Sequence, residues 1–295
     1  MFIIKGLKKY YQISCKIQAF WLLLVVLLLV FSAAPTGAYI LRGPHIIDLM
    51  VRQMGKPDTL LVSQRIVYYS NRFDASVVQA RETVRYIFPD TVRSDSVSEF
   101  AERTRLTTGE DGVTIVDGRV ASSDEYPFDA YNDILMYRSR PLLSQRLSYL
   151  GVDIQSSSFE RFQEKIVLVV GTETPDETVS QVWVDKETFK PVRWLMPGQA
   201  DDGSRLMREV RYLDWRQVNS VWYPMLMEFY EGGVLLREIR VERMKVNLTF
   251  PQELFDVARL RVEHAALEDD ADDETVSEEL NEVQESIDEF RKKYE

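Results

Sequence analysis

The chain has 295 residues and a formal net charge of −11 at pH 7, and 45% of its residues are hydrophobic. This length suits one large domain or two small ones. The acidic balance argues against a nucleic-acid partner, because nucleic acids are bound by basic surfaces. The one cysteine, Cys15, precedes the long apolar run of the N-terminus. The rest of the chain therefore has no thiol from which a disulfide could form.

Residues 1–38 have the three-part order of an export signal. They carry four lysines and no acidic residue, with an apolar run at Ala19–Phe31 and small residues up to Ala38. This order predicts a secretory signal peptide that is cleaved after Ala38. The alternative is an uncleaved anchor, because the uncharged window 17–41 exceeds the roughly 20 residues of a membrane-spanning helix. Both interpretations place residues 39–295 outside the cytoplasm, and the second adds a membrane anchor at residues 19–38.

Residues 43–122 predict a short helix followed by an antiparallel meander. Pro44 suits the first turn of a helix and Gly55 suits its end, with apolar residues spaced three and four apart between them. From Thr59 to Ser122, apolar residues alternate with charged ones, and turn signals such as Asp117-Gly118 interrupt the chain. The pattern predicts a sheet with one dry face and one wet face.

Residues 128–150 change to a helical period. Their apolar residues predict one or two helices that are interrupted near Ser139–Pro141 and capped by Gly151. Because these helices interrupt a meander, we expect them to cover its dry face. Phe159 to Val170 is then predicted to be a strand.

The stretch from Gln181 to Phe255 predicts several more antiparallel strands, with turns at Asp185–Lys190 and Glu231–Gly233. Its inward face is predicted to be large and apolar, with the acidic residues on the opposite face. Methionine side chains on this face are flexible and polarisable, which suits a surface that accepts varied apolar ligands. Three residues of the strand after Pro191 are predicted to share the inward face, namely Val192, Trp194 and Met196.

The tail, residues 261–295, is a separate segment with 14 acidic and four basic residues. Six of the seven residues in Glu268–Glu274 are acidic, which predicts a solvated linker. A heptad seam of apolar residues then runs through residues 275–294. Two interpretations stay open, a solvated helix that docks transiently and a helix that binds a partner or a second copy.

The chain lacks the sequence signatures of common catalytic and metal sites. After residue 38 it has two histidines, His45 and His264, and it has no HExxH, CxxC, GxSxG or glycine-rich phosphate motif. We therefore predict a protein that is not an enzyme, with no metal and no cofactor.

The order of several short segments resembles a known family, the periplasmic lipoprotein carriers and outer-membrane lipoprotein-sorting proteins of the LolA/LolB-like superfamily. The resemblance covers about residues 43–257. It is carried, in order, by the helix ending at Gly55, Tyr86–Arg93, Val116–Gly118, the helical insert, Val182–Glu187, Pro191–Arg193, Trp222–Pro224, Val246–Asn247 and Pro251–Asp256. The acidic tail is not part of the family pattern, and no functional arginine of the carriers can be assigned to a position here.

The resemblance implies an α+β fold, a half-open and strongly curved antiparallel β-barrel whose concave face is covered by helices. It divides the chain into a signal or anchor at 1–38, a lipid-binding domain at 39–260, and the acidic linker and helix at 261–295. The expected lining of an apolar cavity is Tyr86, Phe88, Leu142, Leu143, Leu147, Leu150, Trp194, Met196, Met225, Met227, Phe229, Ile239 and Val241.

The implied function is to hold acyl chains of lipids or lipoproteins, for outer-membrane lipoprotein sorting or lipid transfer, with a membrane or transporter as partner. The alternative is an envelope regulatory or scaffold protein of the same fold, with the helix at 275–294 docking a partner.

Overall fold

The strands of the protein form one antiparallel sheet within the part of the chain that the computed structural model describes, namely residue 21 and residues 40–69, 78–109, 111–121, 127–174, 176–199 and 203–265. The strands are β1 (Thr59–Tyr68), β2 (Val78–Ile87), β3 (Thr91–Ser98), β4 (Glu102–Thr108), β5 (Asp111–Val116), β6 (Arg119–Val120), β7 (Ser157–Phe162), β8 (Lys165–Val170), β9 (Gln181–Asp185), β10 (Pro191–Gln199), β11 (Arg205–Val218), β12 (Val221–Glu231) and β13 (Val234–Val246). The helical elements are α2 (Gly43–Met54), η1 (Pro127–Ala130), α3 (Tyr131–Met136), α4 (Arg140–Tyr149), η2 (Gln252–Phe255) and α5 (Val257–Glu263).

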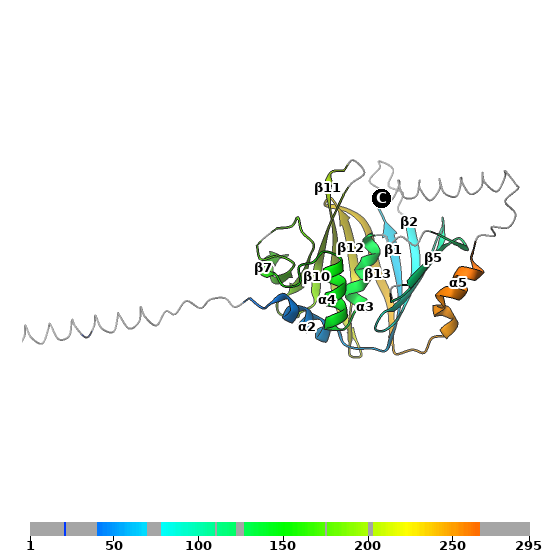
Figure 1. Ribbon diagram of the computed structural model, residues 1–295, viewed down its shortest axis with the longest axis horizontal. Helices are drawn as coiled ribbons and strands as arrows, with labels where there is room; N and C mark the ends of the chain where they lie inside the picture. The colour runs from blue at the N-terminus through cyan, green and yellow to red at the C-terminus, as the bar shows by residue number, and fades with distance from the viewer. Residues whose placement is uncertain are drawn as a thin grey trace, which may run out of the picture. The chain divides into compact units, whose positions relative to one another are not determined.

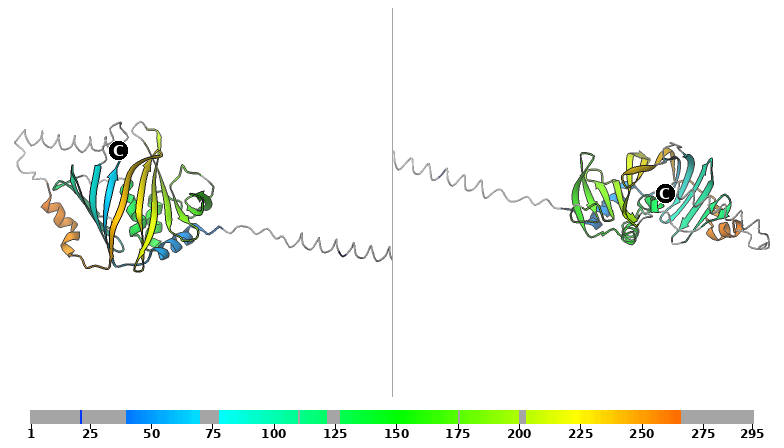
Figure 2. Two further views of the ribbon diagram at one scale, coloured as in Figure 1. Left: turned by 180° about the vertical axis from the view of Figure 1, so that it is seen from behind. Right: turned by 90° about the horizontal axis from the view of Figure 1, so that it is seen from above.

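Two meanders, β1–β6 and β7–β13, are joined where the first strand pairs with the last. The β1–β13 register runs from Leu60 opposite Val246 to Tyr68 opposite Arg237. The strand order leaves β6 and β7 as the two edges, so the sheet stays open. It curls around α3 and α4 (Figures 1 and 2). The prediction of a half-open, curved antiparallel barrel with helices on its concave face is confirmed.

Helix α2 forms where the sequence predicts it, and Gly55 is the residue that ends it. Gly55 has φ +84°, and a Cβ atom there would lie 2.3 Å from the carbonyl oxygen of Ser220. Only glycine tolerates both the left-handed backbone and this close approach. The apolar residues of the helix, including Ile46 and Met50, are fully buried against the concave side of the sheet.

The insert between β6 and β7 forms two helices on the concave face, as predicted, and they separate at the expected break near Ser139. Helix α4 begins with Pro at its first turn. Helix α5 lies on the opposite, convex side, where Val257 and Leu260 pack on β4 and β5 (Figure 1). The predicted domain boundary at residue 260 falls inside this helix.

The prediction of one strand over Phe159–Val170 is wrong, because the segment is the hairpin β7–β8. Its turn is Gln163-Glu164, and both residues have positive φ, +47° and +66°. A two-residue turn of this kind favours Asn-Gly or Asp-Gly in the sequence. Gln-Glu gives no such signal, so the alternating apolar residues on either side of it predict one continuous strand.

The prediction that Val192 shares a face with Trp194 and Met196 is also wrong. The pairing of β9 with β10 shifts between Pro191 and Arg193, and such a bulge moves a side chain to the other face. Val192 therefore packs on the convex side, against Trp183 and its neighbours, while Trp194 and Met196 face the concave side. The predicted signal or anchor at 1–38, apart from residue 21, and the predicted helix at 275–294 lie outside the described residues.

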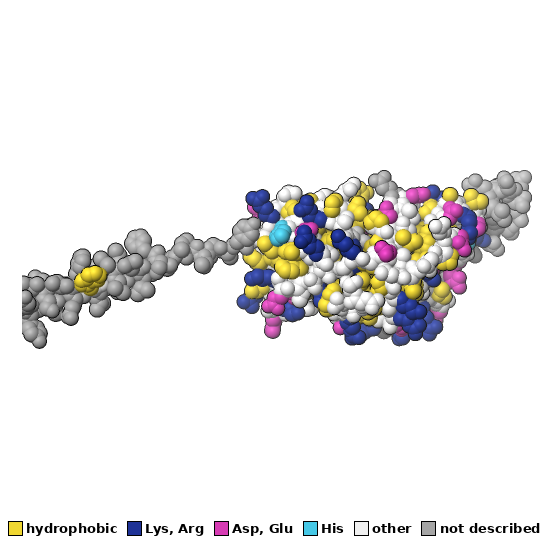
Figure 3. Space-filling view, turned by 90° about the horizontal axis from the view of Figure 1, so that it is seen from below, with side chains coloured by type: hydrophobic (Ala, Val, Ile, Leu, Met, Phe, Trp, Pro, Cys, Tyr) yellow, Lys and Arg dark blue, Asp and Glu magenta, His cyan; other side chains and the backbone are white. Residues whose placement is uncertain are grey.

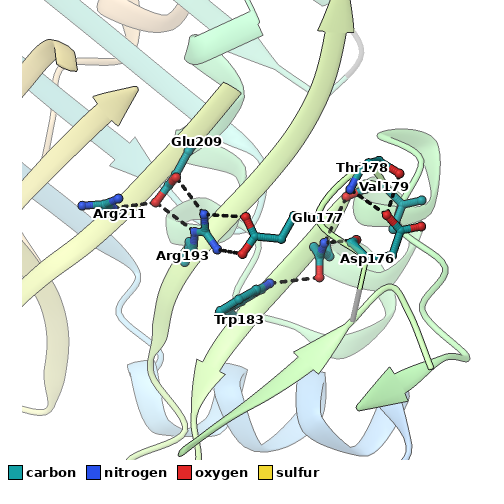
Figure 4. A network of polar contacts seen from close by, with 9 residues as sticks. Asp176, Glu177, Thr178, Val179, Trp183, Arg193, Glu209 and Arg211 are labelled. Atoms are coloured by element: carbon teal, nitrogen blue, oxygen red, sulfur yellow. Dashed lines mark hydrogen bonds and ion pairs between the residues drawn. The ribbon is translucent and has the colours of Figure 1, made fainter. Parts of the chain in front are cut away.

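A buried ionic network lies on the convex face of β9–β11 (Figure 4). The Arg193 guanidinium donates Nε to Glu209 Oε1 at 2.8 Å and Nη1 to Glu177 Oε1 at 2.6 Å. It also stacks on Trp183, 4.5 Å from the ring centroid. Arg211 donates a further hydrogen bond to Glu209. Arg193 and Glu209 are each less than a tenth exposed, so each depends on the other for charge compensation.

The network keeps Glu209 ionised. Burial acts to raise the pKa of the Glu209 carboxyl, but the hydrogen bonds from Arg193 and Arg211 outweigh it and lower the pKa below its ordinary value of 4.5. A carboxyl whose pKa is lowered by folding stabilises the folded state above its unfolded pKa. That stability is lost as the pH falls through the folded pKa.

Glu209→Gln is therefore expected to lower the free energy of unfolding by about 2–3 kcal/mol at pH 7, because it removes an acceptor of charged hydrogen bonds. The difference from wild type should shrink as the pH falls below 4.5. Urea unfolding at pH 7, 5 and 3.5 checks this. Asp214→Asn, whose pair with Arg216 is at least half exposed on both side chains, is the control and should have little effect at any pH. An equal loss in both variants would contradict the assignment.

Candidate functional site

The concave face carries one continuous apolar cluster, and most of the predicted lining residues belong to it. Seven are buried within it, namely Tyr86, Leu143, Leu147, Trp194, Met227, Phe229 and Ile239. Four more pack against it while partly exposed, namely Phe88, Leu150, Met196 and Val241. Leu142 and Met225 are half-buried and are not among the apolar residues packed on this cluster. The structure thus brings eleven of the thirteen together, and their role in binding lipid stays a prediction.

The protein's own side chains fill the concave side of the sheet. Helices α3 and α4 contribute Ile134, Leu135, Leu143 and Leu147, each with no exposed surface, and Trp194 opposite them is equally buried. An apolar ligand on this face must therefore take the place of helix side chains. The helix pair α3–α4 is the element whose movement would open the site.

Polar contacts fasten α3–α4 to the barrel at a few points. The Tyr86 hydroxyl lies 2.6 Å from Asn132 Oδ1 and 3.0 Å from the Tyr223 hydroxyl. The Tyr212 hydroxyl donates to the Tyr131 carbonyl at 3.1 Å. Burial raises the pKa of the phenols of Tyr86, Tyr212 and Tyr223, so these hydroxyls stay neutral hydrogen-bonding groups at neutral pH.

Arg138 ties the junction of α3 and α4 to the end of α2. Its Nε donates to the Leu135 carbonyl at 2.9 Å, and its Nη1 donates to the Met54 carbonyl at 2.5 Å. The guanidinium also lies over the Phe88 ring, 5.2 Å from its centroid. Burial lowers the pKa of Arg138 to about 10, so it keeps its charge at pH 7. Arg138 thus satisfies two buried backbone carbonyls at helix ends, which otherwise lack partners.

Beside η1 the concave face carries a charged region on β2–β5, although Val84 and Tyr86 of β2 belong to the apolar cluster. Arg103 donates to Asp129 of η1 at 2.9 Å, and Arg105 pairs with the same carboxylate. Burial acts to raise the pKa of Asp129, but the two arginines lower it. On β2, Glu82 accepts hydrogen bonds from Gln64 and Ser94. The concave side therefore divides into an apolar half beneath α3–α4 and a charged half beside η1.

Arg237 lies where the two halves meet, and the sequence analysis missed it. Its guanidinium stacks on Phe229 at 3.8 Å, donates to the Phe128 carbonyl at 3.3 Å, and is 7% exposed. Within the described residues, no carboxylate lies within ion-pair distance of it. The signal was present, because Arg237 is in phase with the inward residues Ile239 and Val241. A charged residue on a strand usually faces solvent, so the alternation alone does not predict that Arg237 is buried.

Within the described residues, two buried N–H donors on the concave side have no acceptor. They are Nε of Arg237 and Nε1 of Trp194, and the Oε1 atom of Gln64 is likewise unpaired. An unpaired buried donor costs about 1–3 kcal/mol. Such groups call for an explanation, and a bound ligand oxygen is one.

The described residues offer no other obvious site chemistry. Among them, no group of three or more His, Cys, Asp or Glu side chains is placed to hold a metal ion. None of the helices in the described part of the chain combines the length and the apolar character needed to cross a lipid bilayer.

Comparison with solved structures assigns the fold. A LolA superfamily protein from Nitrosomonas europaea matches 74% of this chain and 99% of its own, with a TM-score of 0.51 and 12% identity. The chain has the LolA-superfamily fold. At this identity the likeness extends to the LolA-type half-open barrel and its covering helices, and to nothing finer.

Other solved structures match a similar share of the chain. A lipoprotein-sorting protein domain from Vibrio parahaemolyticus matches 74% of this chain and 98% of its own at 12% identity, with a TM-score of 0.49. MucB of Pseudomonas aeruginosa in complex with MucA matches 74% of this chain and 62% of its own at 12% identity, with a TM-score of 0.26. No protein-family model and no curated protein matches the sequence.

Arg138→Met is expected to lower the free energy of unfolding by about 2–4 kcal/mol, because two buried carbonyls lose their donor. The neighbouring Arg140 is exposed and has no side-chain hydrogen bond or ion pair to the other described residues. The control variant Arg140→Met should therefore stay within about 0.5 kcal/mol of wild type. Chemical unfolding followed by circular dichroism measures both. A neutral Arg138→Met would mean that Arg138 does not hold the helix junction.

Proposed function

We propose that this protein is a non-catalytic binding protein of the cell envelope. It holds acyl chains of lipids or lipoproteins between the concave face of its sheet and α3–α4, in outer-membrane lipoprotein sorting or lipid transfer. One observation carries the proposal. A LolA-type half-open barrel has its apolar concave cluster covered by two short helices, of 6 and 10 residues, instead of by a second sheet.

The physical basis is an exchange of one apolar filling for another. Burial of each CH₂ group contributes about 0.8 kcal/mol, so an acyl chain can replace the contacts that Leu143 and Leu147 make with the sheet. The net affinity is the difference between the two fillings, and this keeps binding reversible. A membrane or a transporter with a competing apolar site can then withdraw the cargo without any covalent step.

The unpaired donors give this interior a reason to prefer an amphiphile over a plain hydrocarbon. Nε of Arg237 and Nε1 of Trp194 have no protein acceptor. An ester, amide or carboxylate oxygen at the head of an acyl chain is an acceptor of the kind they lack. The charged half of the concave face, with Arg103 and Asp129, is the polar surface beside which such a head would lie.

The location that fits this function is the periplasm, with the protein soluble or tethered according to the fate of residues 19–38. The alternative function, an envelope regulatory or scaffold protein, rests on the apolar seam at 275–294. That seam lies outside the described residues. Under the alternative the barrel would bind its partner with no acyl chain inside.

Tryptophan quenching by brominated acyl chains tests whether the ligand lies on the concave face. Trp194 is buried in the concave cluster and Trp183 in the convex one, so the two report on opposite faces of one sheet. A brominated fatty acid or lysophospholipid is expected to quench the wild type and Trp183→Phe. With Trp215, which also packs against the concave cluster, replaced by Phe in every variant, most of the quenching should be lost in Trp194→Phe, because bromine quenches at contact range.

Native mass spectrometry of the purified protein supplies the companion measurement. We expect a bound species with the mass of a lipid or acyl chain, which detergent exchange removes. Quenching that persists in Trp194→Phe and disappears in Trp183→Phe would contradict the proposal. So would the absence of both a bound lipid and quenching.

A further inference from the structure

Three arginines stand side by side across neighbouring strands on the convex face. Arg65 of β1 is directly opposite Arg81 of β2 on one side and Arg240 of β13 on the other. All three are exposed. The residues on either side of Arg65 in the sequence, Gln64 and Ile66, are buried on the concave side. Like charges placed directly opposite in a sheet destabilise it. We call Arg65, Arg81 and Arg240 the arginine row.

The described residues compensate this row only in part. Arg65 pairs with Glu242 at 2.7 Å, and Arg240 pairs with Glu238. In the described part of the chain, Arg81 has no ion-pair partner. The same face of β13 also carries Arg243 and Lys245, opposite Ser63 and Leu61 of β1. The view from below in Figure 3 shows basic side chains at several places, including a group at its lower edge, with acidic side chains among them.

The line of cross-strand pairs that contains the arginine row runs on through β3 and β4 towards the place where the described chain ends. Arg81 is opposite Val97 of β3, and Val97 is opposite Glu102 of β4. Next to Glu102, Asp117 begins the turn from β5 to β6, with its N–H donating to the Glu102 carbonyl at 2.9 Å. The Nδ1 atom of His264, which follows α5, lies 2.9 Å from the carbonyl oxygen of Gly118 in this turn.

Helix α5 therefore delivers the chain to the β5–β6 turn on the convex side, three strands from Arg81. The helix packs on the convex residues Leu106, Val113 and Ile115. Arg261 fixes its last turn by an ion pair with Asp111 at 2.5 Å. The Val120 N–H donates to the His264 carbonyl at 3.0 Å. The segment that begins at residue 266 thus starts from a defined place.

The reach of the acidic segment matches the row. Neighbouring strands lie about 4.8 Å apart, so Arg81 is about 14 Å and Arg240 about 24 Å from β5 along the row. Glu268 and Glu274 follow His264 by four and ten residues. An extended chain places them up to about 13 to 35 Å away. Six of the seven residues from Glu268 to Glu274 are acidic.

We propose that this acidic segment, Glu268–Glu274, lies across the arginine row and neutralises it. The occupant of the convex face is then a segment of the same chain, chosen by charge complementarity and by the place where α5 ends. The contact consists of exposed ion pairs, so it weakens with salt. It also withholds the row from other anionic surfaces, a negatively charged bilayer among them. The proposal does not depend on what the concave face binds.

Photo-crosslinking in the full chain tests the contact. With p-benzoylphenylalanine at position 271, between the acidic residues, crosslinks to peptides of β1, β2 and β13 are expected at 50 mM salt. Their yield should fall at least fivefold at 500 mM salt. It should fall equally in the triple variant Arg65→Glu, Arg81→Glu, Arg240→Glu. The control triple variant Arg140→Glu, Arg161→Glu, Arg216→Glu changes three exposed arginines elsewhere and should keep the wild-type yield.

Vesicle binding supplies a second readout, with mixtures of phosphatidylglycerol and phosphatidylcholine as the probe. Replacing the six acids of 268–274 by Asn and Gln should raise the affinity for these vesicles at least tenfold, because the row is uncovered. The arginine-row triple variant should cancel that gain. Crosslinks that avoid the three strands, or that ignore salt, would overturn the proposal. Wild-type vesicle binding that depends on the row and is unchanged by neutralising the acids would assign the row to a membrane surface instead.

Discussion

The curved sheet must bury its apolar concave face, and the rest of the structure depends on that requirement. An open sheet that is apolar on one face cannot leave it in water, because burial of this face is the main stabilising term of the fold. In this protein α2, α3 and α4 provide the cover. Trp194, Met227 and Phe229 on the strands are fully buried beneath them. The cover is held by Arg138 and by a few tyrosine hydroxyls instead of by a second sheet.

The proposed exchange of helix side chains for an acyl chain rests on that manner of covering. Leu143 and Leu147 occupy space that an acyl chain could fill with equal benefit, and the polar ties of α3–α4 are separate from the apolar contacts. The cost of opening is then set by a small number of hydrogen bonds. The hydrogen bonds of Arg138 oppose opening most, because their loss leaves two buried carbonyl groups without a donor. Arg237 and Trp194 each place an unpaired N–H donor beneath the cover. The contacts of the closed state do not satisfy these donors.

A few carboxylates balance the buried arginines on both faces of the sheet. The concave arginines 103 and 105 are balanced by Asp129, and the convex Arg193 by Glu209 and Glu177. The arginine row is a convex feature that the described residues compensate incompletely, and it lies on the same face of the sheet as α5, after which the most acidic segment of the chain follows. The two faces of the sheet therefore differ in chemistry, with the continuous apolar cluster on the concave face and exposed ion pairs on the convex face.

The sequence by itself determined much of the architecture. Helix α2 with its Gly55 end and the helical insert follow from periodicity and turn residues, and the half-open barrel follows from the family resemblance that the order of the motifs carries. Each of these signals is local, because it depends on residues only a few positions apart in the sequence. Eleven of the thirteen predicted lining residues are in or against one cluster for the same reason, because alternation along a strand fixes the face that each side chain takes.

Only the tertiary structure decided the features that depend on pairing between distant residues. The bulge that turns Val192 outward and the Gln163-Glu164 turn break the local rules without a local sign. The burial of Arg237 becomes visible only when η1 and β12 surround it. The arginine row exists because the register of β1 with β2 and β13 aligns three residues far apart in sequence, and a shift of one position would have separated them. Periodicity fixes which face a residue takes, whereas register and packing fix which residues meet there.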